Sequence, residues 1–263
     1  MKSELMNFKE GNSPLIATAI HDGHFVREEL KNIMILKEED QLREEDPFTG
    51  DLTDVATTRL ICLRSRFEVD LNRQKNKAVF INPEDAWGLN IYDTPPSQEM
   101  INRSLEEYDS FYNEINKILS DMQKRFGRFV VYDIHSYCYR RNGPDGSEAD
   151  PDLNPDVNIG TETMNRELWS PVIDRFISDM SSFNYFDSKL DVRENIKFKG
   201  GYFPKYIHEK FPESACVLSI EFKKIFMDEW TGKLFKDKFK LLKDALQHTV
   251  PGVLEELAKL NES

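Results

Sequence analysis

Four short apolar runs stand out along a chain that is otherwise rich in polar and charged residues. They cover residues 15–20, 57–63, 129–134 and 215–222. β-Branched and aromatic side chains are frequent in these runs, which is typical of strands buried within a sheet. The pattern therefore predicts four core strands.

Residues 97–125 carry the strongest helical periodicity. Their apolar positions recur every three or four residues, at Ile101, Leu105, Tyr108, Tyr112, Ile115 and Leu119. Such a stripe predicts an amphipathic helix, and Gly127 is expected to end it.

Weaker patterns predict three further helices, at residues 26–36, 163–180 and 235–260, the last interrupted near Pro251. The acidic residues 37–46 are expected to form a solvated helix face or loop that ends in a turn. An extended stretch and two long loops are expected at residues 67–73, 76–94 and 140–155. Strands that alternate with helices predict an α/β fold with a sheet covered on both faces. The chain shows no internal repeat or linker, so residues 1–263 are expected to form one domain.

Composition narrows the classes of function. The formal net charge is −12 and there is no basic block, which argues against nucleic acid or an anionic membrane surface as a partner. No stretch approaches the ~20 apolar residues that span a bilayer, and residues 1–14 lack an apolar signal core. The three cysteines match no zinc or disulfide spacing. We expect them to be reduced and buried, and the protein to be cytoplasmic.

Two histidines follow predicted strands and carry the most informative chemistry. His21 comes directly after the first strand and His135 directly after the third. Ligands in α/β proteins bind at the carboxyl ends of strands, so two imidazoles there suggest a hydrolytic metal centre. Asp133 lies two residues before His135, on the same face of an extended strand, where it can accept the second ring N–H. A buried hydrogen-bonded pair without a metal is the alternative, and position alone does not decide whether His24 is a ligand.

Arginines and one glutamate complete the candidate chemistry. Arg64, Arg66 and Arg73, with Asn72 beside the last, follow the second strand, and arginine is the natural partner of a substrate carboxylate. Surface ion pairing is the alternative. Glu221 stands among apolar residues of the fourth strand, where burial would raise its pKa and suit it to general acid–base catalysis. Alternatively, it faces solvent.

Taken in chain order, seven segments of the sequence resemble the N-formylglutamate amidohydrolase family. They are residues 21–23, 45–46, 65–73, 133–136, 158–161, 199–202 and 219–221. The most specific are the Ser-Arg…Val-Asp-Leu-Asn-Arg and Asp-x-His-Ser pieces. The resemblance implies a three-layer α/β/α sandwich with a mixed, mostly parallel sheet, similar to that of zinc carboxypeptidases.

The resemblance also implies a site. It implies a Zn²⁺ ion held by His21, His135 and an acidic residue of the 45–46 turn, for which we prefer Asp46 over Glu45. Glu221 takes the place of the general base. One departure bears on the third ligand, because the usual Pro-His-Ser-Gly motif is here Ile-His-Asp-Gly-His. Its final residue, His24, has the spacing of the second carboxypeptidase ligand and is the main rival to Asp46.

The remaining implied roles concern substrate binding and support of the ligands. Arg73 is expected to clamp a substrate carboxylate, helped by Asn72, Arg64, Arg66, Gly201 and Tyr202. Asp22, His24 and Asp133 are expected to surround and support the ligands.

The activity that the resemblance implies is hydrolysis of the amide bond of a small N-acyl amino acid, such as N-formyl-glutamate. A zinc carboxypeptidase-like hydrolase of peptides or cell-wall fragments, with a roomier pocket, is one alternative. A metal-free binding protein that keeps the fold is the other. The acyl group, the side-chain preference and the oligomeric state stay open.

Overall fold

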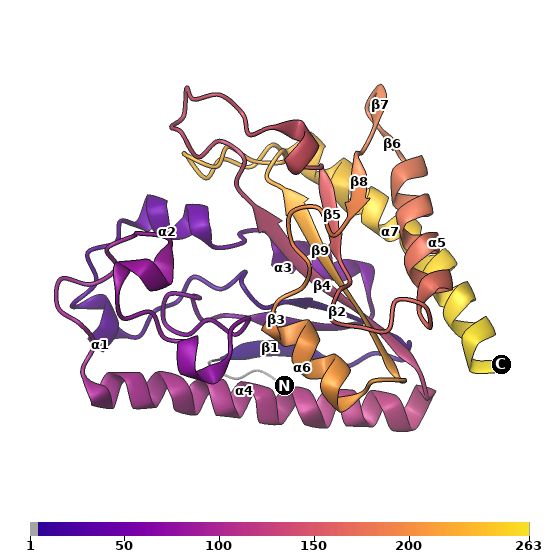
Figure 1. Ribbon diagram of the computed structural model, residues 1–263, viewed down its shortest axis with the longest axis horizontal. Helices are drawn as coiled ribbons and strands as arrows, with labels where there is room; N and C mark the ends of the chain where they lie inside the picture. The colour runs from indigo at the N-terminus through magenta and orange to yellow at the C-terminus, as the bar shows by residue number, and fades with distance from the viewer. Residues whose placement is uncertain (1–4, 263) are drawn as a thin grey trace.

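A mixed seven-stranded sheet in the order β1-β3-β2-β4-β9-β5-β8 forms the centre of the molecule (Figure 1). The computed structural model describes residues 5–262, so residues 1–4 of the predicted polar N-terminal segment lie outside it. The strands are β1 Met6–Lys9, β2 Leu15–Ala19, β3 Thr58–Cys62, β4 Phe129–Tyr137, β5 Val157–Gly160, β8 Val192–Glu194 and β9 Ala215–Lys223. A separate hairpin joins β6 Asn184–Tyr185 to β7 Ser188–Lys189. The four predicted core strands are confirmed.

The four core strands β3, β2, β4 and β9 run parallel to one another, while β1 and β5 pair antiparallel to their neighbours in this group. Parallel pairing places the carboxyl ends of the core strands at one edge of the sheet. The register of β4 and β9 sets His135 beside Glu221, and β2 ends two residues before His21. The fold therefore brings three of the candidate residues to one edge.

Helices cover both faces of the sheet, as the three-layer prediction requires (Figure 1). The helices are α1 Glu28–Lys31, α2 Glu38–Glu44, α3 Thr49–Leu52, α4 Gln98–Phe126, α5 Ser170–Ser182, α6 Tyr202–Lys210 and α7 Lys236–Glu262. Short 3₁₀ turns occupy Thr53–Val55, Lys75–Lys77, Pro83–Ala86 and Pro151–Leu153.

Alternation along β4 explains the two cores. Val130 and Tyr132 belong to the apolar cluster under α5 and α7, whereas Phe129 and Val131 belong to the cluster under α4 and α6. Successive strand side chains point to opposite faces, so a run that is apolar throughout needs cover on both sides. This is why the strands read as continuous apolar runs.

The ends of α4 agree with their predicted signals. Ser97 accepts a hydrogen bond from the Met100 N–H at 3.3 Å, and Gly127 ends the helix with φ of 73°. A left-handed φ is cheap only for glycine, which explains the helix end at this residue.

Several local predictions are wrong. Only Glu28–Lys31 of the helix expected at residues 26–36 is helical. The helix expected from residue 163 begins at Ser170, where a proline in the first turn favours a start. The C-terminal helix continues through Pro251, because buried residues on both sides of the proline hold it against the core.

The stretch 67–73, expected to be extended, is instead a series of turns. Backbone N–H groups of Glu68 and Val69 both donate to the Ser65 carbonyl, and Arg73 N–H donates to the Asp70 carbonyl.

Strands β1, β5 and β8 and helix α6 were not predicted. All three cysteines are buried and free, as expected. None of the helices in residues 5–262 combines the length and the apolar character needed to cross a membrane.

Candidate active site

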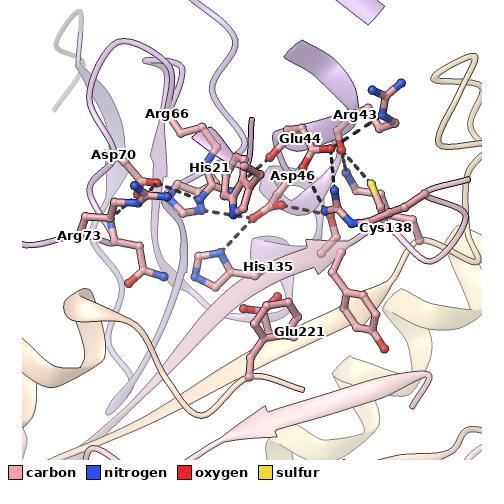
Figure 2. A pocket seen from close by; sticks show the side chains of 17 residues that line it. His21, Arg43, Glu44, Asp46, Arg66, Asp70, Arg73, His135, Cys138 and Glu221 are labelled. Atoms are coloured by element: carbon pink, nitrogen blue, oxygen red, sulfur yellow. Dashed lines mark hydrogen bonds and ion pairs between the residues drawn. The ribbon is translucent and has the colours of Figure 1, made fainter. Parts of the chain in front are cut away.

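A cavity of about 210 Å³ opens at the carboxyl edge of β4 and β9 (Figure 2). Its lining comprises His21, Arg43, Glu44, Asp46, Arg66, Asp70, Asn72, Arg73, Trp87, His135, Ser136, Tyr137, Cys138, Arg141, Phe198, Glu221 and Lys224. Most of these side chains are charged or polar. The cavity is therefore built for a polar ligand.

Three buried side chains converge at the centre of the cavity: His21, Asp46 and His135 (Figure 2). One ligand atom from each lies within 4.8 Å of the other two. Nδ1 of His135 is 2.9 Å from the Asp46 carboxylate, and Nδ1 of His21 is 3.5 Å from it. Two imidazole nitrogens and one carboxylate oxygen match the donor set of catalytic zinc sites.

Two further buried carboxylates lie at the outer nitrogens of these imidazoles: Asp70 is hydrogen-bonded to His21, whereas Asp133 lies beside His135 without a hydrogen bond. Nε2 of His21 lies 2.9 Å from Asp70 Oδ1, and Nε2 of His135 lies 3.1 Å from Asp133 Oδ2. Asp70 and Asp133 are both fully buried. A carboxylate at Nε2 favours the tautomer with its proton there, which leaves the Nδ1 lone pair free to face a metal. The residues present fit a divalent cation.

The charges around His21, Asp46 and His135 also favour a cation at the centre of the cavity. Burial alone would lower the pKa of His135, but the carboxylates of Asp133 and Asp46 raise it well above its ordinary value. Burial alone would raise the pKa of Asp46, but the two histidines hold it below its usual range. Opposite charge within a few ångströms outweighs desolvation here.

The structure separates Asp46 from its rivals Glu45 and His24. The Glu45 carboxylate points away from the cavity, accepts a hydrogen bond from Gln41 Nε2 at 2.9 Å, and contacts Ser65 Oγ and His24 Nδ1. Neither Glu45 nor His24 lines the cavity. Of the three candidates, only Asp46 therefore lies with His21 and His135 at the centre of the cavity.

Local backbone contacts fix the position of Asp46. Its N–H donates to the His21 carbonyl at 3.0 Å, so the turn after α2 is tied to the end of β2. Asp22 lies behind this turn and accepts the Gly50 N–H at 2.9 Å. Burial raises the pKa of Asp22 to about 6. Asp22 thus anchors the start of α3, the helix that follows Asp46.

Glu221 faces the same cavity from the neighbouring strand (Figure 2). It is paired in register with His135, and side chains of paired residues in adjacent strands point to the same face. Burial raises its pKa to about 7. A carboxyl with a pKa near neutrality can both accept and return a proton.

Arg66 and Arg73 form one end of the cavity around Asp70 (Figure 2). Arg66 donates to Asp70 at 2.8 Å, and Arg73 Nε lies 3.5 Å from the same carboxylate. Both guanidinium groups lie against the ring of Trp87, at 4.9 and 5.5 Å from its centroid. Two cations therefore share one buried acid, which leaves positive charge at this end.

Three residues expected to bind substrate lie outside the lining. Arg64 donates instead to Glu107 of α4 at 3.0 and 3.1 Å. Gly201 and Tyr202 begin α6. Asn72, which does line the cavity, accepts the Phe203 N–H at 3.0 Å, and a Cβ on Gly201 would overlap the Asn72 side chain. Gly201 is therefore required for close packing against Asn72.

Sequence reasoning missed several residues of the lining, among them Arg43, Glu44, Trp87, Arg141 and Lys224. Arg141 donates to both Glu44 oxygens at 3.0 Å. These residues come from the acidic run, from two segments expected to be loops, and from just past β9. One signal could have found two of them. The resemblance placed the acidic turn at residues 45–46 beside the histidines, and Arg43 and Glu44 directly precede this turn.

Comparisons with known proteins agree with the fold. The family model for N-formylglutamate amidohydrolase matches residues 13–227. The solved structure of N-formylglutamate amidohydrolase from Ralstonia eutropha JMP134 superposes with a TM-score of 0.73 at 17% identity, with 99% of each chain covered. A gene product of Agrobacterium tumefaciens superposes with a TM-score of 0.68 at 14% identity, with 95% of each chain covered. No curated protein sequence matches the chain. Identities this low show a shared fold.

Proposed function

The chain belongs to the N-formylglutamate amidohydrolase family, and from this membership and the cavity geometry we propose that it is a zinc-dependent hydrolase of small N-acyl amino acids, such as N-formyl-glutamate. The observation that carries the proposal is the convergence of His21, Asp46 and His135 within 4.8 Å, in a cavity that Glu221 also lines. The likeness to zinc carboxypeptidases and the cytoplasmic location stay predictions.

His21, His135 and Asp46 would hold the zinc ion, with Asp70 fixing the His21 imidazole and Asp133 lying beside that of His135. When bound there, zinc would lower the pKa of a water molecule towards about 7 and polarise a carbonyl oxygen.

Glu221 acts as the general base and then as the general acid. Its carboxylate takes a proton from the water that attacks the amide carbon, and afterwards gives that proton to the leaving nitrogen. A pKa of about 7 suits both directions of transfer near neutral pH. Released products are a carboxylic acid and a free amino acid.

Arg73 binds the carboxylate of the amino-acid part, with Arg66 beside it. The Arg73 side chain is 26% exposed; its Nη1 donates to the Asp85 carbonyl at 2.7 Å and its Nε lies 3.5 Å from Asp70, so Nη2 is the donor we assign to the substrate. A cavity of about 210 Å³ is smaller than the roughly 300–1,000 Å³ typical of pockets for drug-sized ligands. The size favours a small N-acyl amino acid over a peptide or cell-wall fragment.

Metal analysis and a substrate panel test the proposal together. Purified protein should contain one zinc per chain and hydrolyse N-formyl and N-acetyl derivatives of glutamate, aspartate and leucine. Chelation should abolish the activity and added zinc should restore it. Preferred cleavage of dipeptides would favour the carboxypeptidase-like alternative. Ligand binding without zinc or turnover would favour a binding protein, and either outcome would refute the proposal.

A further inference from the structure

Lys224 differs from the other cations of the cavity. Four cations of the described lining pair with acids: Arg43 with Asp40, Arg66 and Arg73 with Asp70, and Arg141 with Glu44. Lys224 is 1% exposed, and its ammonium group contacts two backbone carbonyls rather than a carboxylate of the described chain. A buried ammonium without an acidic partner is costly, so its position calls for a reason.

The two carbonyls belong to the end of α2. Lys224 Nζ donates to the Arg43 carbonyl at 2.6 Å and to the Glu45 carbonyl at 2.7 Å. Carbonyls in the last turn of a helix lack helical partners, and the helix dipole favours a cation there. Lys224, the residue directly after β9, therefore caps the carboxyl end of α2.

The segment that Lys224 holds leads directly to Asp46. The carbonyl between the two that Lys224 binds, that of Glu44, accepts a hydrogen bond from Arg66 at 3.2 Å. Cavity cations thus hold three successive carbonyls, and the next residue is the proposed acidic ligand. The Asp46 N–H is in turn tied to the His21 carbonyl. Asp46 has little freedom to turn away from the imidazoles.

We propose that Lys224 is a positioning residue that sets the metal affinity of the site by fixing the turn that carries Asp46. This inference rests on the proposed function, since it concerns the same zinc site. Lys224 lies three residues after Glu221 and directly after β9, so one short segment supplies both the proposed general base and the clamp on the turn that carries Asp46.

The sign of the effect on metal affinity distinguishes positioning from simple electrostatics. If Lys224 acted only as a nearby positive charge, its removal would tighten the binding of a divalent cation, because like charges repel. If it positions Asp46, its removal should weaken binding, by roughly 10- to 100-fold as for other residues that orient metal ligands.

Zinc dissociation constants of folded variants, measured by competition with a chelating indicator, test the proposal. Lys224→Met should bind zinc about 10- to 100-fold more weakly than wild type, and Lys224→Arg, which keeps charged donors, should recover most of the affinity. Lys223→Met is the matched control. Its ammonium pairs with Asp156 at 2.7 Å and does not line the cavity, so the zinc affinity of this variant should stay close to that of wild type.

The outcomes of this measurement distinguish failure of the positioning role from failure of the proposed function. Equal or tighter zinc binding by Lys224→Met, or an arginine variant as weak as the methionine variant, would overturn the positioning role while leaving the proposed function intact. If Lys224→Met does not fold, Lys224→Gln, which keeps a neutral donor, is judged by the same comparison. Wild-type protein that binds no zinc would instead refute the proposed function.

Discussion

His21 and His24 lie three residues apart, and Glu45 and Asp46 are neighbours, yet the two histidine–carboxylate pairs sit in different surroundings. The His21–Asp46 pair meets a second imidazole and leaves two ring nitrogens facing one point. In the His24–Glu45 pair the carboxylate is fully occupied by Gln41, Ser65 and His24 itself. The comparison teaches that the residue types alone do not make a candidate metal site. What distinguishes the first pair is that ligand atoms of three side chains, His21, Asp46 and His135, converge within 4.8 Å.

Replacing His135 breaks the first cluster and should have the largest effect. We expect His135→Ala to lower kcat/KM by more than about 10,000-fold, because the metal chemistry and the orientation of Asp46 are lost together. Steady-state hydrolysis of N-formyl-glutamate, or of the best substrate of the panel, measures this. His24→Ala is the control from the second cluster, and a comparable loss there would contradict the distinction between the two.

Glu221→Gln should separate proton transfer from metal binding. The amide has the size of the carboxyl but cannot accept the proton, so kcat should fall by roughly 1,000-fold, within the range of general-base contributions. Zinc content should be unchanged, as measured by metal analysis of the same preparation. Full activity in this variant would exclude Glu221 as the base.

His208 sharpens the comparison, because this histidine has no acidic partner among residues 5–262. Its Nε2 accepts the Val217 N–H at 3.0 Å, its Nδ1 bonds to Thr163 Oγ1 at 2.9 Å, and burial lowers its pKa from 6.5 to about 4. The folded state therefore binds fewer protons than the unfolded state between these values. The contribution of neutral, buried His208 to the free energy of unfolding is therefore complete above pH 6.5. It falls by up to about 3 kcal/mol as the pH drops to 4.

Urea unfolding of wild type and His208→Gln at pH 7 and pH 5 measures this contribution. The variant cannot take up the proton, so its free energy of unfolding should fall less between the two pH values than that of wild type. Equal losses in the two proteins would show that His208 does not titrate as its surroundings predict.

Arg73→Ala tests the positive end of the cavity. Loss of a charged hydrogen bond to the substrate carboxylate should raise KM by about 10- to 100-fold, corresponding to roughly 1.5–3 kcal/mol. The value of kcat should change little if the contact is made equally in the ground and transition states. Arg64→Ala is the matched control, because Arg64 pairs with Glu107 outside the cavity. A higher KM in the control alone would exchange the roles assigned to the two arginines.

The sequence predicted those features of the candidate site that depend on where the strands end. His21 and His135 follow apolar runs that form β2 and β4, and these strands are parallel neighbours, so their ends had to meet. The preference for Asp46 over Glu45 and His24 came from the family resemblance and not from the pattern, because side-chain direction after α2 depends on Lys224 and Arg66, which reach it from the residue after β9 and from the turn that follows β3. The same holds for Asp70, whose place beside His21 arises from turns where an extended segment was expected.

Zinc stoichiometry of Asp46→Asn against Glu45→Gln tests the central claim most directly. The two substitutions are adjacent and chemically equivalent, and each removes one carboxylate charge. The account predicts that equilibrium dialysis will find one tightly bound zinc per chain in wild type and in Glu45→Gln, and strongly weakened binding in Asp46→Asn. Equal binding in the two variants, or weakened binding in Glu45→Gln alone, would contradict it.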